Sequence, residues 1–144
     1  MPNLPLGSWI LWALLSATFA ALTAVFAKIG VGGIDSDIAT FVRTAVVVAL
    51  LAAILAARGL LPSVTAISGH SLAFLALSGL ATGASWLCYF RALQIGDAAR
   101  VAPVDKLSGV LVAIFGAIFL GEHLAPHNWL GVVLIAAGAL LVVL

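Results

Sequence analysis

Charged residues are scarce in this chain, and their scarcity limits the kind of protein it can be. Of the 144 residues only 8% are charged and 65% are hydrophobic, with a mean hydropathy of +1.30. A water-soluble domain of this size cannot cover its surface with so few charged groups. A formal net charge of +1 also argues against a nucleic-acid partner, which requires a clustered basic face. The chain is therefore predicted to be an integral membrane protein surrounded by the lipid bilayer.

Cysteine and catalytic motifs are also nearly absent. The single cysteine, Cys88, lies within an apolar run, so neither a disulfide framework nor a cysteine-based metal site is available. His123 and His127 have i,i+4 spacing, but Pro126 breaks the helix that would align them. The sequence contains no zinc-protease, nucleotide-binding or esterase motif. It therefore predicts no enzyme, no metal site and no cofactor.

Long apolar runs separated by short polar turns make up most of the chain. Runs of about 20 apolar residues are long enough to cross the ~30 Å hydrocarbon core of a membrane as helices. Glycine and aspartate mark the turns; Asp35, Ser36 or Asp37 can cap the second helix, and Asp97 the fourth. The prediction is an all-α integral membrane protein, with residues 1–144 as a single membrane domain and spans at about 9–28, 38–58, 71–94, 98–121 and 128–144.

The N-terminal stretch and the charges predict how the chain lies in the membrane. The residues before Trp9 lack the basic region of a signal peptide, so the first span is expected to be retained. With five spans, every Lys and Arg except Arg58 falls toward the side opposite the N-terminus. Basic side chains mark the cytoplasmic side of a membrane protein. We therefore expect the N-terminus outside and the C-terminus inside.

Hydroxyl and aromatic side chains recur at helical spacing on three of the spans. One interpretation places these faces around a small cavity, where they contact a substrate. The alternative is that each hydroxyl bonds the carbonyl four residues earlier or a neighbouring helix. The candidate substrate-binding residues are Ser16 and Thr23 on the first span, Arg43 and Thr44 on the second, and Thr82, Ser85, Trp86 and Tyr89 on the third.

The fourth span begins with a helix-breaking residue and two charged residues: Pro103, Asp105 and Lys106. Charged side chains within a membrane span are costly, so their presence there suggests a structural or functional role. Pro103 falls in the second turn and is expected to kink or thin the helix there. Asp105 and Lys106 are adjacent and point about 100° apart on a continuous helix, so we expect them not to neutralise each other. Arg43 and Arg91 are the expected partners. The cluster of Asp105, Lys106 and Arg91 either contacts substrate or coupling ions, or only anchors helix ends by snorkelling.

Small residues form faces of another kind. Gly109, Ala113 and Gly116 share one side of the fourth span. Such faces let helix backbones approach closely in lipid, where no hydrophobic effect drives association. We interpret them as packing surfaces. Glu122, at the end of this span, is interpreted as a turn residue and not as a coupling acid.

Short motifs in the second half of the chain occur together. They are ALxxGDAxxVAP from Ala92 to Pro103, FLGE from Phe119 to Glu122, WxG from Trp129 to Gly131, and LIxxG from Leu134 to Gly138. Their combination resembles the EamA domain of the drug/metabolite transporter superfamily, and the resemblance extends over the chain from about Trp9 onward. It implies a bacterial or archaeal inner-membrane carrier that exports or exchanges small metabolites or drugs.

The resemblance also implies a partner. Longer members of the family resemble two such units in inverted orientation around a substrate cavity, so this single unit is expected to form a homodimer or to pair with a related half-transporter. By the same analogy Pro103 borders the transport path. Four-span multidrug relatives use a glutamate in the first span, but here that span holds no acid, so Asp105 is the better candidate for coupling.

Two questions stay open at this level. An antiparallel homodimer requires insertion in both orientations, which conflicts with the strong Lys and Arg bias of this chain. A non-transporting assembly or accessory subunit, or a flippase for lipid-linked substrates, are the alternative functions.

Overall fold

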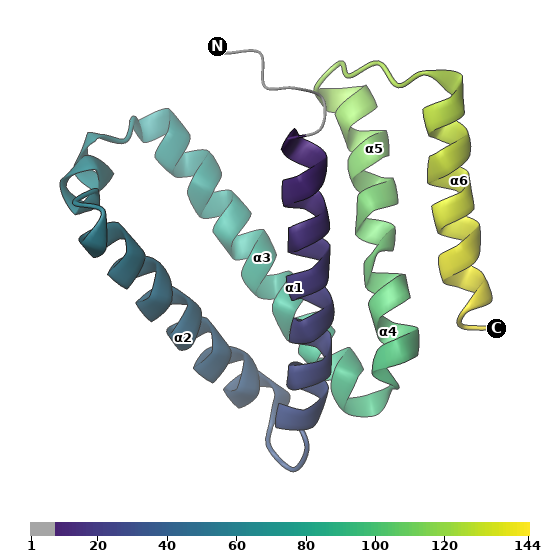
Figure 1. Cartoon of the computed structure of the whole chain (residues 1–144), viewed down its shortest axis with the longest axis horizontal. Coiled ribbons are helices and arrows are strands. Elements are labelled where there is room, and N and C mark those ends of the chain that lie inside the picture. The colour runs from purple at the N-terminus through teal and green to yellow at the C-terminus, as the bar shows by residue number, and fades with distance from the viewer. Residues whose placement is uncertain (1–7) are drawn as a thin grey trace. The chain divides into compact units, whose positions relative to one another are not determined.

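The structure, a computed structural model, describes residues 8–144 as helices joined by short loops (Figure 1). The helices are α1 (Ser8–Gly30), α2 (Ser36–Ala57), α3 (Gly69–Ile95), α4 (Ala98–Asp105), α5 (Leu107–Phe119) and α6 (Pro126–Leu141), with a short 3-10 helix, η1 (Leu61–Ala66), between α2 and α3. The all-α prediction is confirmed. The first seven residues, which bear on the prediction of a retained first span, lie outside the described residues.

Within the described residues, four helical segments are long and apolar enough to cross a membrane: α1, α2, α3, and α4 with α5 taken together as Ala98–Phe119. The apolar α6 is shorter, with 16 residues. At 1.5 Å per residue it extends over about 24 Å, less than the ~30 Å hydrocarbon core. Four long spans and one shorter apolar helix agree with the predicted five-span unit.

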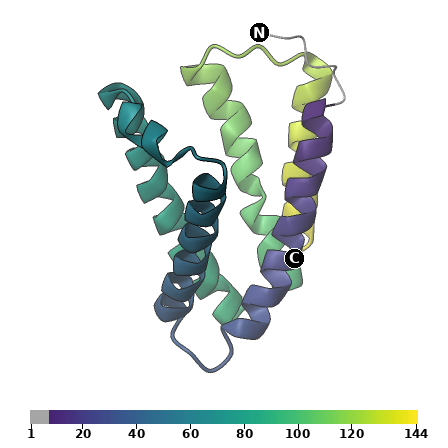
Figure 2. The ribbon, with the colours of Figure 1, turned by 60° about the vertical axis from the view of Figure 1, so that its left-hand side comes forward.

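The chain divides by its internal contacts into two compact units. The α2–α3 unit is Ala27–Ile95; the α4–α6 unit combines residues 8–26 of α1 with Gly96–Leu144. In the α2–α3 unit the two long helices run side by side and antiparallel, connected through η1 (Figure 1, Figure 2). In the α4–α6 unit, α5 follows α4, and α6 packs antiparallel against α5 (Figure 1).

Helical spacing determines which faces of α2 and α3 are covered. On α2, Ser36 and Thr40 are buried and Arg43 is half-buried; on α3, Trp86 is half-buried and Phe90 is buried. Residues three or four apart lie on one side of a helix, so each set forms a single stripe. Most other apolar side chains of these helices are exposed, which suits helices that face lipid.

The helix starts differ in how they are capped. The Asp35 Oδ1 atom accepts hydrogen bonds from the backbone N–H groups of Asp37 at 2.8 Å and Ile38 at 3.3 Å, so Asp35 is the residue that caps α2. Asp97 occupies the cap position of α4, but its side chain forms no capping hydrogen bond. Both predicted cap positions are therefore confirmed, and the capping hydrogen bonds form only at Asp35.

The fourth span is interrupted between α4 and α5. Pro103 lies inside α4, and the interruption falls one turn further along, at Lys106. The Lys106 N–H is shared between the carbonyls of Ala102 at 3.3 Å and Pro103 at 3.2 Å, and the Gly109 N–H bonds the Lys106 carbonyl at 3.0 Å. A proline lacks the N–H that would bond the carbonyl four residues earlier, which for Pro103 is the Ala99 carbonyl. The interruption at Lys106 lies on the other side of the proline, so the missing N–H does not account for it.

Candidate functional site

Arg43 lies beside the aromatic side chains of α3. Its guanidinium carbon is 4.2 Å from the centroid of the Trp86 ring and 5.5 Å from that of the Phe90 ring. Both distances are within the range of cation–π attraction, which contributes about 0.5–2 kcal/mol. The Tyr89 side chain also interacts electrostatically with Arg43. In the α2–α3 unit, a cation on one membrane-spanning helix thus contacts aromatic rings on the other, Trp86 and Phe90.

Two threonines occupy the same part of α2 as Arg43. The Thr40 hydroxyl donates to the Ser36 carbonyl at 2.8 Å, and the Thr44 hydroxyl donates to the Thr40 carbonyl at 2.7 Å. Each hydroxyl proton therefore goes to the preceding turn of its own helix. The oxygens retain lone pairs, so these groups can still accept a hydrogen bond from a ligand.

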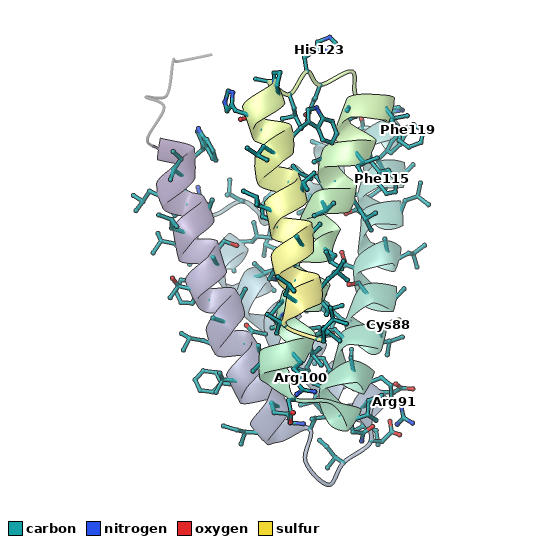
Figure 3. All side chains as sticks on the ribbon, turned by 90° about the vertical axis from the view of Figure 1, so that its right-hand side faces the viewer. Cys88, Arg91, Arg100, Phe115, Phe119 and His123 are labelled. Atoms are coloured by element: carbon teal, nitrogen blue, oxygen red, sulfur yellow. The ribbon has the colours of Figure 1, made fainter. Side chains whose placement is uncertain are left out.

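Polar side chains also tie together the end of this unit where α3 finishes. The Lys28 Nζ atom donates to the Leu93 carbonyl at 2.7 Å. The Gln94 amide donates to the Ile34 carbonyl at 2.9 Å and accepts from the Arg91 guanidinium at 2.7 Å. Figure 3 labels Arg91 near this end of α3. These bonds join the last turn of α1 and the following loop to α3, and they hold Trp86 and Phe90 on a fixed helix.

The structure brings together some of the predicted substrate-binding residues. Arg43 lies near Trp86 and Tyr89 of the same α2–α3 unit, and Thr44 follows Arg43 on α2. Thr82 and Ser85 are exposed on α3, and the Thr82 hydroxyl donates to the Ser78 carbonyl at 2.8 Å.

Ser16 and Thr23 lie on the part of α1 that belongs to the other unit; Ser16 is exposed and Thr23 is half-buried. For Ser16, Thr23, Thr82 and Ser85, substrate contact stays a prediction.

Asp105 and Lys106 form an ion pair with each other. The Lys106 Nζ atom lies 3.3 Å from the Asp105 Oδ2 atom, with the two side chains 62% and 34% exposed. The expectation that these adjacent residues do not pair is wrong, because the long, flexible Lys106 side chain reaches the Asp105 carboxylate although the two positions are about 100° apart. Exposed pairs of this kind contribute about 0–1 kcal/mol. Arg91, expected as a partner for this pair, instead bonds Gln94.

Sequence reasoning missed Phe90 and Lys28. Phe90 is only 3% exposed and shares the Arg43 contact with Trp86. Its signal in the sequence is the apolar spacing of Trp86, Phe90 and Leu93, which is separate from the hydroxyl-bearing face of α3. No pattern in the sequence predicts that Lys28 reaches a main-chain carbonyl far along the chain.

Glu122 folds back over the end of α5. Its N–H donates to the Gly116 carbonyl at 3.1 Å, and Gly121 before it has a φ of +66°, which favours glycine. A Cβ atom on Gly116 would lie 2.8 Å from the Glu122 Oε2 atom. Phe115 and Phe119 point from α5 away from α6, with ring centroids 5.9 Å apart (Figure 3). This geometry suits Glu122 to the role of a turn residue.

Metal ligands do not gather in the part of the chain that the structure describes. Among residues 8–144 there is no group of three or more His, Cys, Asp or Glu side chains placed to hold a metal ion. His123 lies in the loop between α5 and α6, and Cys88 is exposed on α3 (Figure 3).

Comparison with known proteins identifies the family. The family model of the EamA-like transporter family matches residues 7–144. This chain belongs to the EamA-like transporter family. It is 67% identical over 134 residues to a protein of a Sinorhizobium species described as an uncharacterized transporter in the cobO 3' region; the match covers 93% of this chain and 95% of that protein. No solved structure matches the chain significantly.

Family membership gives the site its context. An EamA-like transporter is a multi-pass membrane protein that moves a substrate across the bilayer, and this is not an enzyme family. The resemblance found in the sequence motifs is confirmed. In an EamA-like unit, the cation and aromatic rings of the α2–α3 unit are therefore candidates for substrate contact.

Proposed function

We propose that this chain is a secondary-active carrier that exports or exchanges a small metabolite or drug across a bacterial or archaeal inner membrane. The observation that supports a substrate site is the stack of Arg43 on Trp86 and Phe90. A charged side chain within a membrane span costs about 2.5–3.5 kcal/mol on insertion scales and usually has a functional role. The substrate contacts that we propose are Arg43, Thr44, Trp86 and Tyr89.

The carrier is proposed to work as a dimer, either with a second copy or with a related half-transporter. Related carriers alternate access around a fixed site between two repeats, and one unit supplies only half of such an arrangement. We propose an N-terminus outside and a C-terminus inside, because all Lys and Arg residues except Arg58 lie toward one side.

Coupling, if protons drive the carrier, is assigned to Asp105. This carboxylate is paired with Lys106 next to the helix interruption, where a change in charge can alter local backbone geometry. We expect Asp105→Asn to abolish pH-driven flux without changing assembly. An unchanged pH dependence of flux in vesicles rules out this role.

Solute counterflow in proteoliposomes tests the proposed function. Purified protein is reconstituted, the vesicles are preloaded with amino acids, organic acids, sugars or organic cations, and uptake of the labelled solute is followed. Saturable counterflow of at least one solute supports a carrier. Absence of flux together with a stable hetero-complex indicates an accessory subunit, and lipid scrambling without solute flux indicates a flippase.

Thiol labelling tests the orientation and the form of the dimer. On a Cys88→Ala background, single cysteines are placed at Gly33 and Gly59, and intact cells are treated with an impermeant reagent. Labelling at Gly59 alone supports the proposed orientation, with a parallel dimer or a separate partner. Labelling at both positions contradicts it and indicates dual insertion and an antiparallel homodimer.

A further inference from the structure

We propose that Arg43 binds the oxyanion of the solute, so that the transported molecule is a small organic anion with a carboxylate or phosphate group. This inference rests on the proposed transport function and adds the substrate class. It begins with the position of Arg43. The residue lies seven positions after Ser36, the first residue of α2, and so about 10 Å into the helix along its axis.

The α2–α3 unit does not neutralise this cation. Within residues 27–95 the Arg43 guanidinium forms no ion pair and no hydrogen bond. Its contacts are with the Trp86 and Phe90 rings, and Tyr89 lies close enough to interact with it electrostatically. The acids of the unit are Asp35 and Asp37, which precede Arg43 by about two turns. Asp35 caps α2, and Asp37 accepts from the Ser36 hydroxyl at 3.4 Å.

The other cations at this end of the unit already donate to protein groups. Lys28 donates to the Leu93 carbonyl, and Arg91 donates to the Gln94 side chain. The hydroxyls of Thr40 and Thr44 donate to their own helix. Among these cations, Arg43 is therefore the one whose N–H donors bond no acceptor within residues 27–95.

The aromatic contacts leave the hydrogen-bonding capacity of the guanidinium unused. The Trp86 and Phe90 rings attract the positive charge but carry no carboxylate or carbonyl oxygen to accept from its five N–H donors. Those donors match the two oxygens of a carboxylate or phosphate, which bind a guanidinium in a bidentate manner. Trp86 and Phe90 hold the cation without competing for these donors. A cationic solute would be repelled at this position.

Equilibrium dialysis of the purified full chain in a zwitterionic detergent tests the inference with matched labelled probes. The carboxylates are nicotinate and succinate, their neutral counterparts are nicotinamide and succinamide, the phosphate is glycerol phosphate, and the cation is tetraethylammonium. We expect at least one oxyanion to bind at least about tenfold more tightly than its neutral counterpart or the cation. Equal binding of acid and amide, tighter binding of the cation, or no oxyanion binding below about 10 mM overturns the proposal.

Variants identify the residue responsible. We expect Arg43→Gln to weaken oxyanion binding at least about tenfold and Arg43→Lys to weaken it less, because lysine keeps the charge but loses the planar fork. Arg58→Gln is the matched control, since Arg58 is an exposed arginine at the other end of α2, and it is expected to leave binding unchanged. Thermal unfolding confirms that each variant is folded. An unchanged affinity in folded Arg43→Gln, or an equal loss in Arg58→Gln, overturns the assignment.

Two variants of Trp86 test the contribution of the aromatic ring to binding. Trp86→Phe keeps an aromatic face under Arg43 and is expected to retain most of the affinity, whereas Trp86→Leu removes it and is expected to lose affinity several-fold. An equal affinity in both variants contradicts a role for the stack.

Competition by lipid shows whether the bound anion is a solute or a lipid headgroup. Counterflow shows whether the anion proposal and the carrier proposal fail separately. Added phosphatidylglycerol that displaces the probes completely at low lipid ratios assigns the site to a lipid headgroup and overturns a solute site. If counterflow occurs only with cations or neutral solutes, the carrier function stands and the anion inference fails. If oxyanions bind through Arg43 without any counterflow, the site stands and the carrier function fails.

Discussion

The two antiparallel helix pairs of this chain, α2 with α3 and α5 with α6, are stabilised by different chemistry. Around α3, polar side chains reach main-chain carbonyls distant in sequence, from Lys28 to Leu93 and from Gln94 to Ile34, and Arg43 stacks on Trp86. Between α5 and α6, no side-chain hydrogen bond is formed within the described residues 96–144, and α5 carries Gly116 as its buried residue.

The difference separates two tasks that a small membrane unit has to perform. α5 and α6 pack against each other by van der Waals contact, which brings helices together in lipid without any charged group. A charged group inside a span is expensive to place there, and Arg43 lies about 10 Å into α2, so we propose that the solute binds in the α2–α3 unit. Substitutions that remove a polar contact of the α2–α3 unit should therefore lower stability more than substitutions of the exposed charged groups near α5 and α6.

The largest effect on stability is expected for Lys28→Ala. The 2.7 Å bond from the Lys28 ammonium to the Leu93 carbonyl is charge-assisted and partly buried, and such bonds contribute about 1.5–3 kcal/mol. Thermal unfolding in detergent measures the loss. Lys106→Ala is the matched control, because its exposed ion pair contributes about 0–1 kcal/mol. Equal losses of stability in Lys28→Ala and Lys106→Ala contradict a larger contribution from the polar contacts of the α2–α3 unit.

The next largest effect is expected in the loop of the other pair. Gly121 has a φ of +66°, and an alanine in this conformation costs about 1–2 kcal/mol. Gly121→Ala should therefore destabilise the chain by about this amount in the same assay. Gly131→Ala, in a helix with no atom close to the added Cβ, is the control and should be neutral or stabilising. A neutral Gly121→Ala shows that the turn is not required.

A smaller effect is expected for Gln94→Ala. This change removes the neutral hydrogen bond to the Ile34 carbonyl, which contributes about 0.5–1.5 kcal/mol, together with the acceptor for Arg91. Gln94→Glu restores an acceptor for Arg91 but not the donor to Ile34, so a comparison of their melting temperatures separates the two bonds. Full stability in Gln94→Ala indicates that neither bond contributes.

The smallest effect is expected for Gly116→Ala. The added Cβ would lie 2.8 Å from the Glu122 Oε2 atom, but this atom is the end of a flexible exposed side chain that can move away. Alanine also favours the helix over glycine by about 1 kcal/mol. The two terms nearly cancel, so we expect a change within about 0.5 kcal/mol. A loss of several kcal/mol instead shows that the Glu122 position is rigidly required.

Much of the fold could be predicted from the sequence because the signals are local. Apolar runs of span length, Asp35 before α2 and Gly96 after α3 mark helices without knowledge of their neighbours. The prediction for the fourth span was less accurate. Helix geometry alone placed Asp105 and Lys106 on different faces, whereas the flexible Lys106 side chain reaches the Asp105 carboxylate.

The candidate site could be predicted only in part, because it depends on which helix faces meet. Arg43 and Trp86 were both candidates from residue type and depth, but their contact depends on the register of α2 against α3. The helical spacing of hydroxyl groups predicted Thr82 and Ser85, which are exposed, and not Phe90, which is buried. The Lys28 contact could not be predicted, because its acceptor is a main-chain carbonyl and every residue has one.

Solute protection of single cysteines tests the central claim that the α2–α3 unit holds the substrate. On a Cys88→Ala background, Thr44→Cys beside Arg43 and Ala137→Cys on α6 are labelled in proteoliposomes with a permeant maleimide, with and without a solute that shows counterflow. We expect the solute to slow labelling at position 44 several-fold and to leave position 137 unchanged. Protection at position 137 with none at position 44 contradicts the account.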